Sequence, residues 1–133
     1  MSYYFSTTIP GGFDEIIDRV KVELKKEGFG VLTEIDVKQT LKAKLQVDFD
    51  KYTILGACNP TYAYEALQKE SKIGTMLPCN VIVRETAEGK VEVAAIDPIA
   101  SMTAVQNEDL KGIAIEVQAK LKKVIDNLGS SPD

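Results

Sequence analysis

The last third of the chain constrains the fold most, because apolar residues recur there at intervals of three and four. Such spacing places the apolar side chains on one side of a helix. The stripe consists of Leu110, Ile113, Ala114, Val117, Leu121, Val124, Ile125 and Leu128. A second stripe begins at Phe13 and runs to Leu24, and Gly28 follows it as a helix terminator. Each predicted helix is apolar on one side only, so we expect both to cover one sheet in a two-layer α+β domain.

Five segments have the composition or alternation of β-strands. They are residues 2–9, 29–35, 52–57, 79–86 and 91–95. The segment 52–57 is almost wholly apolar, so we expect it in the centre of the sheet. The turn at Ala87–Gly89 predicts a hairpin between the last two strands.

Two shorter helices are expected between these strands. Asp36 is a good N-cap for a short amphipathic helix that carries Val37, Leu41 and Leu45. Asn59 and Pro60 predict the start of another helix, which Gly74 would end. The expected inward side of this helix carries Tyr62, Ala63, Ala66 and Leu67. The predicted order is β-α-β-α-β-α-β-β-α in one five-stranded sheet, with an additional short turn or helix at Asp97-Pro98.

The length of 133 residues corresponds to about one domain. We assign the domain to residues 1–128 and predict that 129–133 are disordered, because Gly, Ser and Pro there offer little to bury. No stretch approaches the ~20 apolar residues that a membrane span needs. The first residues lack the basic and apolar regions of a signal peptide, so we expect a cytoplasmic protein without membrane contact.

The chain contains no histidine, which excludes several kinds of site within a single chain. Ser-His-Asp and Cys-His catalysis are excluded, as are zinc sites that use histidine. The net charge is −4 and no basic stripe is present, so nucleic acid is not an expected partner. Whether the protein is an enzyme stays open, with the balance against it, because no motif supplies a general base near neutral pH.

Two segments that contain cysteine are the candidates for a functional site. Cys58 stands between a strand and the predicted helix start at Asn59, where backbone N–H groups can stabilise a thiolate or bind an anion. Cys79 and Asn80 begin another strand after Pro78. The alternative for both cysteines is that they are small apolar residues packed in the core.

Other chemistries have weaker support. A disulfide is not expected in a reducing compartment, and the spacing of Cys58 and Cys79 is not that of a CxxC redox motif. No metal centre is predicted, because structural zinc normally takes four Cys or His ligands. The carboxylates Glu34, Asp36 and Asp97 form a weak constellation, and helix capping explains the two aspartates.

Four segments, in this order and spacing, closely resemble the bacterial and archaeal family numbered 302 among the domains of unknown function. They are residues 30–37 (GVLTEIDV), 52–60 (YTILGACNP), 77–81 (LPCNV) and 96–98 (IDP). The resemblance covers about Tyr3 to Leu128 and makes residues 57–60 and 78–80 hallmark segments. It implies a fold similar to the TATA-binding-protein-like class, with a curved, mainly antiparallel sheet and helices on one face. It also implies that a homodimer is plausible, but it supplies no reaction and no catalytic residue.

Three functions therefore stay open. The first is a module that binds a small molecule or anion in the concavity between the sheet and the helices. Its predicted binding residues are Cys58, Asn59, Cys79, Asn80 and Asp97. The second is a thiol-based redox enzyme or sensor in which Cys58 reacts and Cys79 resolves. The third is a homodimeric interaction protein, with Ile115 as a candidate contact because it lies off the apolar stripe.

Overall fold

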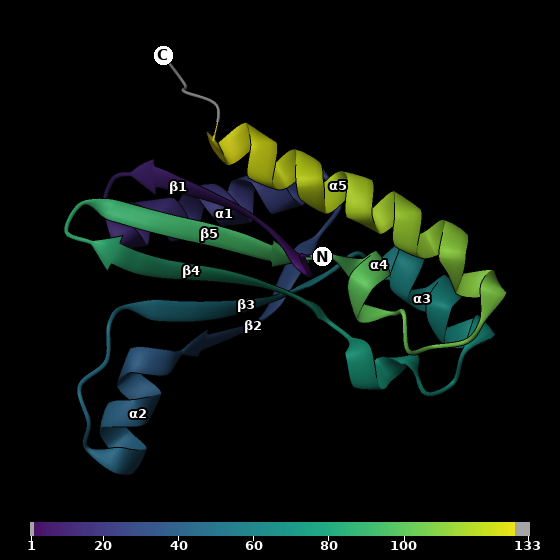
Figure 1. The fold of residues 1–133 in the computed structure, drawn as a ribbon, viewed down its shortest axis with the longest axis horizontal. Helices are drawn as coiled ribbons and strands as arrows, with labels where there is room; N and C mark the ends of the chain where they lie inside the picture. Colours follow the sequence, from purple (N-terminus) through teal and green to yellow (C-terminus); the bar gives the residue numbers. More distant parts are fainter. Residues whose placement is uncertain (1, 130–133) are drawn as a thin grey trace.

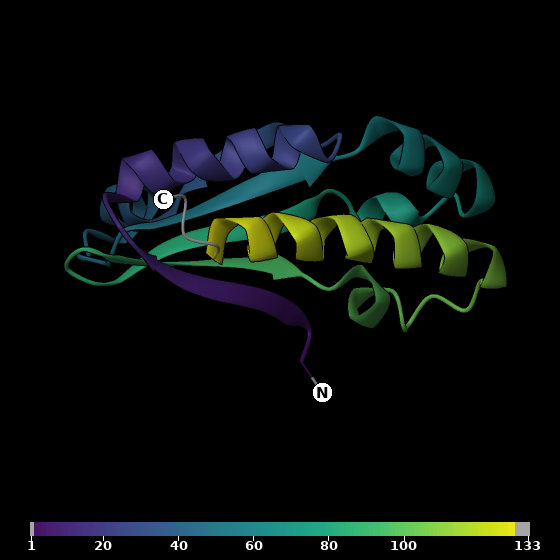
Figure 2. The same ribbon diagram turned by 90° about the horizontal axis from the view of Figure 1, so that it is seen from above.

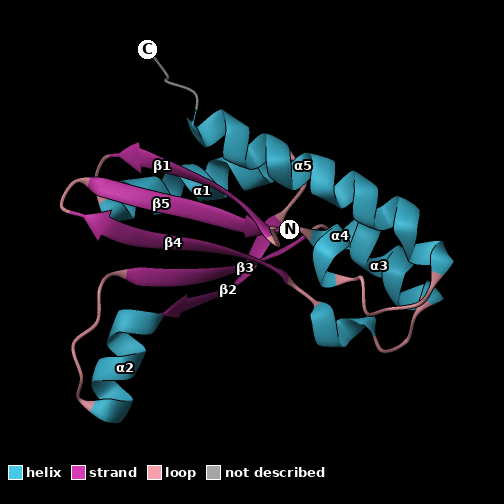
Figure 3. Cartoon of the chain, in the orientation of Figure 1, coloured by secondary structure: helices cyan, strands magenta, loops and turns pink. Residues whose placement is uncertain are grey.

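The computed structural model describes residues 2–129 and contains one sheet with helices around it (Figures 1 and 3). The strands are β1 (Tyr4–Pro10), β2 (Gly30–Asp36), β3 (Tyr52–Cys58), β4 (Cys79–Ala87) and β5 (Lys90–Ile96). The helices are α1 (Phe13–Lys26), α2 (Val37–Leu45), α3 (Pro60–Lys69), α4 (Pro98–Ser101) and α5 (Lys111–Gly129), with short 3-10 helices at Ile73–Met76 and Glu108–Leu110. The α+β class and the predicted order of the main elements are confirmed.

The five strands lie in the order β1-β5-β4-β3-β2, and every neighbouring pair is antiparallel. The hairpin between β4 and β5 turns at Gly89, whose φ of 77° is readily adopted by glycine. The prediction that residues 52–57 occupy the centre is wrong, because β4 is the middle strand and β3 is next to the edge strand β2. β3 is nevertheless largely buried, because it is paired on both sides and its residues Leu55 and Ala57 belong to the core. Thr33 and Pro78 lie close to Gly56 and leave no room for a side chain there.

The core lies between the sheet and the two long helices, α1 and α5, which run side by side over one face (Figure 2). Alternate residues of β4 and β5 point toward these helices, and Val81, Val83, Val91 and Val93 are fully buried there. Leu121 of α5 is fully buried as well. Helix packing on one face of the sheet, as predicted from the two apolar stripes, is confirmed.

Helix α2 was expected to have an apolar side, but it lies beyond the edge strand β2 and none of its residues is buried (Figure 1). Its start is as expected, since Asp36 Oδ1 accepts a hydrogen bond of 2.9 Å from the backbone N–H of Gln39. The apolar positions Val37 and Leu41 are only half-buried, and Leu45 is 66% exposed. A short helix with three apolar residues is thus formed without a core for them to enter.

Two helix ends also depart from the prediction. Helix α3 ends at Lys69 rather than at Gly74, since the next residue, Glu70, is extended. Asn107 from a distant loop donates a hydrogen bond of 2.9 Å to the Lys69 carbonyl. Helix α5 continues through Gly129, which the sequence placed in a disordered tail, and residues 130–133 lie outside the described residues. Among the described residues, no helix combines the length and the apolar character that a membrane crossing requires.

Candidate functional site

The two cysteine segments meet where β3 ends and β4 begins, because Ala57 lies directly opposite Cys79 in the sheet. Cys58 and Cys79 both line a cavity of about 40 Å³ at this place. Its other walls come from α3, α4 and α5, which lie at the right-hand end of the molecule in Figure 1. The space is large enough for one or a few water-sized groups.

The chain reaches this position through a turn that Asn59 fixes. Asn59 is the residue before α3, as predicted, but its side chain makes no capping hydrogen bond. Its Nδ2 instead donates to the Glu27 carbonyl over 3.3 Å, which ties the start of α3 to the end of α1. A Cβ on Gly28, whose φ is 86°, would approach the Asn59 amide to 3.0 Å, so glycine allows this close packing.

Cys79 is 9% exposed and its thiol is held in the neutral form. Burial, and secondarily the proximity of Cys58, raise its pKa to about 11 from the ordinary value of 9.0. Both cysteines are free thiols. The Leu77–Pro78 peptide bond immediately before Cys79 is cis. At neutral pH, Cys79 therefore contributes an uncharged sulfur to the wall of the cavity.

Tyr62 of α3 also lines this cavity. Partial burial raises its pKa, and the neighbouring Glu116 of α5 raises it further through its charge and a hydrogen bond with the phenol. The hydroxyl of Tyr62 is thus protonated and donates to the Glu116 carboxylate. The sequence placed Tyr62 on the inward side of α3 but did not indicate this partner.

Two of the predicted site residues lie elsewhere. Asn80 points to the opposite side of the sheet, where it lines a separate hollow. Asp97 caps α4, because its Oδ1 accepts hydrogen bonds of 3.0 Å from the Ile99 backbone N–H and from Gln118 Nε2. The structure thus brings together Cys58, Asn59 and Cys79, but not Asn80 or Asp97.

A larger groove of about 600 Å³ adjoins the cavity, and sequence reasoning did not find it. Met102 and Ala114 line both spaces. The groove runs between α5 and the segment that follows α4, and Asn107, Glu108 and Lys111 supply polar groups to it. The apolar stripe placed Leu110 and Ala114 on the inward side of the last helix, but nothing in the sequence places either residue near the cysteines.

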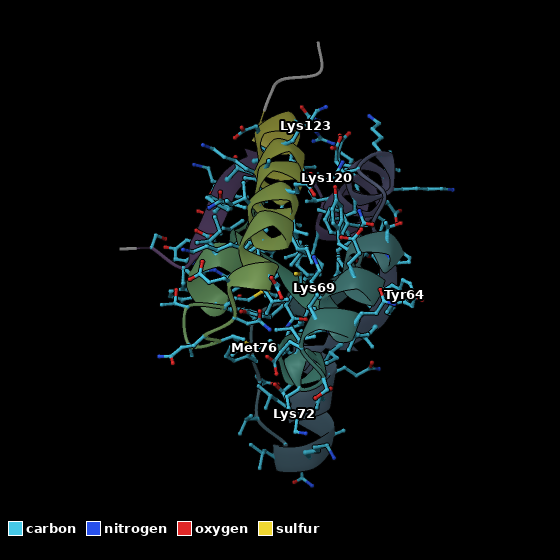
Figure 4. All side chains as sticks on the ribbon, turned by 90° about the vertical axis from the view of Figure 1, so that its right-hand side faces the viewer. Tyr64, Lys69, Lys72, Met76, Lys120 and Lys123 are labelled. Atoms are coloured by element: carbon cyan, nitrogen blue, oxygen red, sulfur yellow. The ribbon has the colours of Figure 1, made fainter. Side chains whose placement is uncertain are left out.

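The walls of the cavity are almost entirely apolar. None of the described residues that line it carries a charged side chain. Lys69 of α3 and Lys120 and Lys123 of α5 are labelled in Figure 4, and none of these three lysines lines the cavity. Within residues 2–129, no group of three or more Cys, Asp or Glu side chains is arranged to hold a metal ion.

Comparisons with known proteins agree with this architecture. The model of the family described as "Domain of unknown function DUF302" matches residues 5–128. A crystal structure of an uncharacterized conserved DUF302 protein from Bacillus stearothermophilus superposes with a TM-score of 0.88 and 29% sequence identity. That match covers 96% of this chain and 99% of the other. No curated protein matches the chain. The match over nearly the whole chain shows that this protein belongs to the DUF302 family.

Proposed function

We propose that the protein is a binding module for a small, uncharged organic molecule, held at the end of the sheet where the cysteine segments meet. The observation that carries the proposal is that the cavity beside Cys58 and Cys79 shares Met102 and Ala114 with the larger groove. The groove volume of about 600 Å³ lies in the usual range for small-molecule sites. A ligand body would lie in the groove and insert a small apolar end into the cavity.

The chemistry of the walls favours an uncharged ligand over the anion that the sequence also allowed. An anion in an apolar cavity needs a cation or several hydrogen-bond donors, because burying an unpaired charge is costly. The described lining of the cavity contains no lysine or arginine, and Cys79 is a neutral thiol there. The polar groups of Asn107 and Lys111 lie only in the outer groove, where they could orient a ligand.

Filling the wall that the two spaces share tests the proposal. In Ala114→Leu, the larger side chain would occupy that wall, whereas Ala119→Leu changes the same helix at an exposed position and serves as the matched control. A set of uncharged aromatic and aliphatic fragments is titrated into each protein and followed by amide chemical shifts. We expect binding to the native chain and to Ala119→Leu, with at least a roughly tenfold loss in Ala114→Leu. Equal binding to all three would place the site elsewhere.

The thiol-based alternative has less support. It needs one sulfur to attack and the other to resolve, and the thiolate is the reactive form. The raised pKa keeps Cys79 protonated at neutral pH, so resolution by this sulfur would be slow. Titration with a thiol reagent under native conditions separates the two functions. Rapid modification of both Cys58 and Cys79 near pH 7 would favour the redox alternative.

Self-association is a second candidate function, and the open side of the sheet favours it. Helices α1 and α5 cover one face of the sheet (Figure 2), and on its other face the large apolar side chains of Tyr3, Tyr4 and Ile35 are exposed. Large apolar side chains that are exposed together commonly mark an interaction site. We therefore propose that the chain forms a homodimer. Light scattering across a concentration series should give twice the chain mass of 14.6 kDa, whereas the single-chain mass throughout would refute it.

A further inference from the structure

The cavity beside the cysteines and the groove next to it are adjoining spaces of very different size. The cavity measures about 40 Å³ and the groove about 600 Å³. Met102, the residue that ends α4, and Ala114 of α5 line both spaces and so stand where one passes into the other. Alanine has no side chain beyond its methyl group, whereas methionine is long, unbranched and flexible. Met102 is therefore the side chain that controls how far a ligand reaches.

The cavity has room for a short group only. A water-sized group needs about 10–15 Å³ of such a volume, so about three of them fit. A methylene group is close to a water molecule in size. The part of a ligand that enters the cavity therefore has about three carbon atoms.

The polar side chains in the wall of the cavity are already engaged within the protein. Asn59 donates to the Glu27 carbonyl over 3.3 Å. The phenol of Tyr62 is hydrogen-bonded to Glu116. Cys79 is a neutral thiol at neutral pH. A polar group buried here would lack a strong partner, which is costly, so the group that enters is aliphatic.

The groove suits a larger apolar body. Ile99 of α4 and Ile115 of α5 both belong to its wall and are 36% and 55% exposed. Ile115 lies off the apolar stripe that packs α5 onto the sheet, so the core does not account for it. Exposed apolar side chains that line one hollow are typical of a binding groove. The full apolar lining of the groove consists of Ile99, Met102, Val105, Leu110, Ala114 and Ile115.

Two polar side chains of the groove also have partners within the protein. Asn107 donates to the Lys69 carbonyl over 2.9 Å. Lys111 pairs with Glu108 over 3.2 Å, and both of these side chains are exposed to solvent. The charges at the rim are thus balanced without a ligand. A polar, uncharged group of the ligand can remain there beside the solvent.

We infer that the ligand is an uncharged amphipathic molecule with an apolar body and an aliphatic end of about three carbon atoms, and that Met102 sets the length of that end. This inference rests on the binding function proposed above and names the class of ligand. Each methylene group that enters the cavity should raise the affinity about fourfold. Further carbon atoms should add nothing, because the cavity is then full.

A series of para-alkylbenzamides, from the parent benzamide to the hexyl compound, tests the limit of length. The aromatic amide serves as the uncharged body, and the alkyl chain as the end that enters the cavity. Dissociation constants are measured by titration calorimetry. With the native chain, we expect affinity to rise about fourfold for each carbon as far as propyl, and to stop rising from butyl to hexyl.

Met102→Ala tests which residue sets the limit. Removing the side chain beyond Cβ should make room for roughly two more carbon atoms, so affinity should rise as far as pentyl. Met76→Ala is the matched control, because Met76 (labelled in Figure 4) is half-buried against the core but lines neither space. Circular dichroism establishes that each variant is folded. If Met102→Ala does not fold, Met102→Val, which keeps more of the side chain, replaces it.

Ile115→Ala tests the contact with the body of the ligand. It should weaken every member of the series, the parent benzamide included, by the same factor of roughly threefold, and should leave the limit at propyl. Because Ile115 is 55% exposed, its substitution should not disturb the fold. An effect that grows with the length of the chain would place Ile115 beside the aliphatic end and contradict this arrangement.

The results separate the inference from the proposal on which it rests. A native chain that binds no member of the series overturns both. Binding whose affinity keeps rising through hexyl overturns the limit of length but leaves the binding function standing. A limit that stays at propyl in Met102→Ala, or that moves equally in Met76→Ala, overturns the role of Met102.

Discussion

The native protein should lose stability at alkaline pH because Cys79 is buried, and Cys79→Ala should not show this part of the loss. In the folded protein, burial raises the pKa of this thiol to about 11 from the ordinary value of 9.0 that we take for the unfolded chain. Between these values the unfolded chain loses the proton while the folded protein retains it. The thiol thus contributes its full stabilisation below about pH 9, and this contribution is lost as pH rises toward 11.

The size of the effect follows from the shift in pKa. Each pKa unit corresponds to about 1.4 kcal/mol, so the shift of Cys79 amounts to at most about 3 kcal/mol above pH 11. At about pH 10.5 the native protein should have lost about 2 kcal/mol through this group, and at about pH 8 almost nothing. Contributions from all other groups are common to the variants and cancel in the comparison.

Urea unfolding at these two pH values, followed by circular dichroism, measures the free energy of unfolding. The native chain should lose about 2 kcal/mol more between them than Cys79→Ala does. Cys58→Ala is the control and should keep most of the native dependence, because Cys58 is the smaller cause of the raised pKa. Equal losses in the native chain and in Cys79→Ala would refute the assignment of Cys79 as a buried neutral thiol.

Two further predictions concern the segments around the site. Gly56→Ala should lower the free energy of unfolding by about 1–3 kcal/mol, because the added Cβ would meet Thr33 and the ring of Pro78. Adding Thr33→Ala to this variant should recover part of the lost stability, as measured by urea unfolding. A neutral Gly56→Ala would show that this packing is looser than described. Asp97→Ala should cost about 1–2 kcal/mol by removing the cap of α4 and the contact with Gln118, whereas Asp97→Asn should cost less by the same measurement. Equal losses in both variants would point to a charge effect instead.

Local chemistry explains which features could be predicted from the sequence. The apolar stripe of α5 predicts its buried side because helix geometry alone relates positions three and four apart. The caps at Asp36 and Asp97 are equally local, since each carboxylate binds an N–H only a few residues away. Leu67 is a counterexample within α3, because it was assigned to the inward side and is 46% exposed.

Features that depend on distant residues could not be predicted in this way. Asn107 binds the last carbonyl of α3 from a distant loop, and the side chain of Asn59 binds the end of α1 instead of capping its own helix. The pairing of β3 with β4 explains why Cys58 and Cys79 share a cavity, and no local pattern predicts which strands pair. The position of Ala114 in the walls of the cavity and the groove likewise depends on how α5 packs over the end of the sheet.

The central claim is that ligand binding occurs beside the two cysteine segments, and a residue-resolved chemical-shift map tests it most directly. The isotopically labelled chain is titrated with the fragment that binds best. We predict that the largest shifts fall on Cys58, Tyr62, Cys79, Met102 and Ala114. Shifts confined to the side of the sheet opposite α1 and α5, for example at Ile82 and Ala94, would contradict the account.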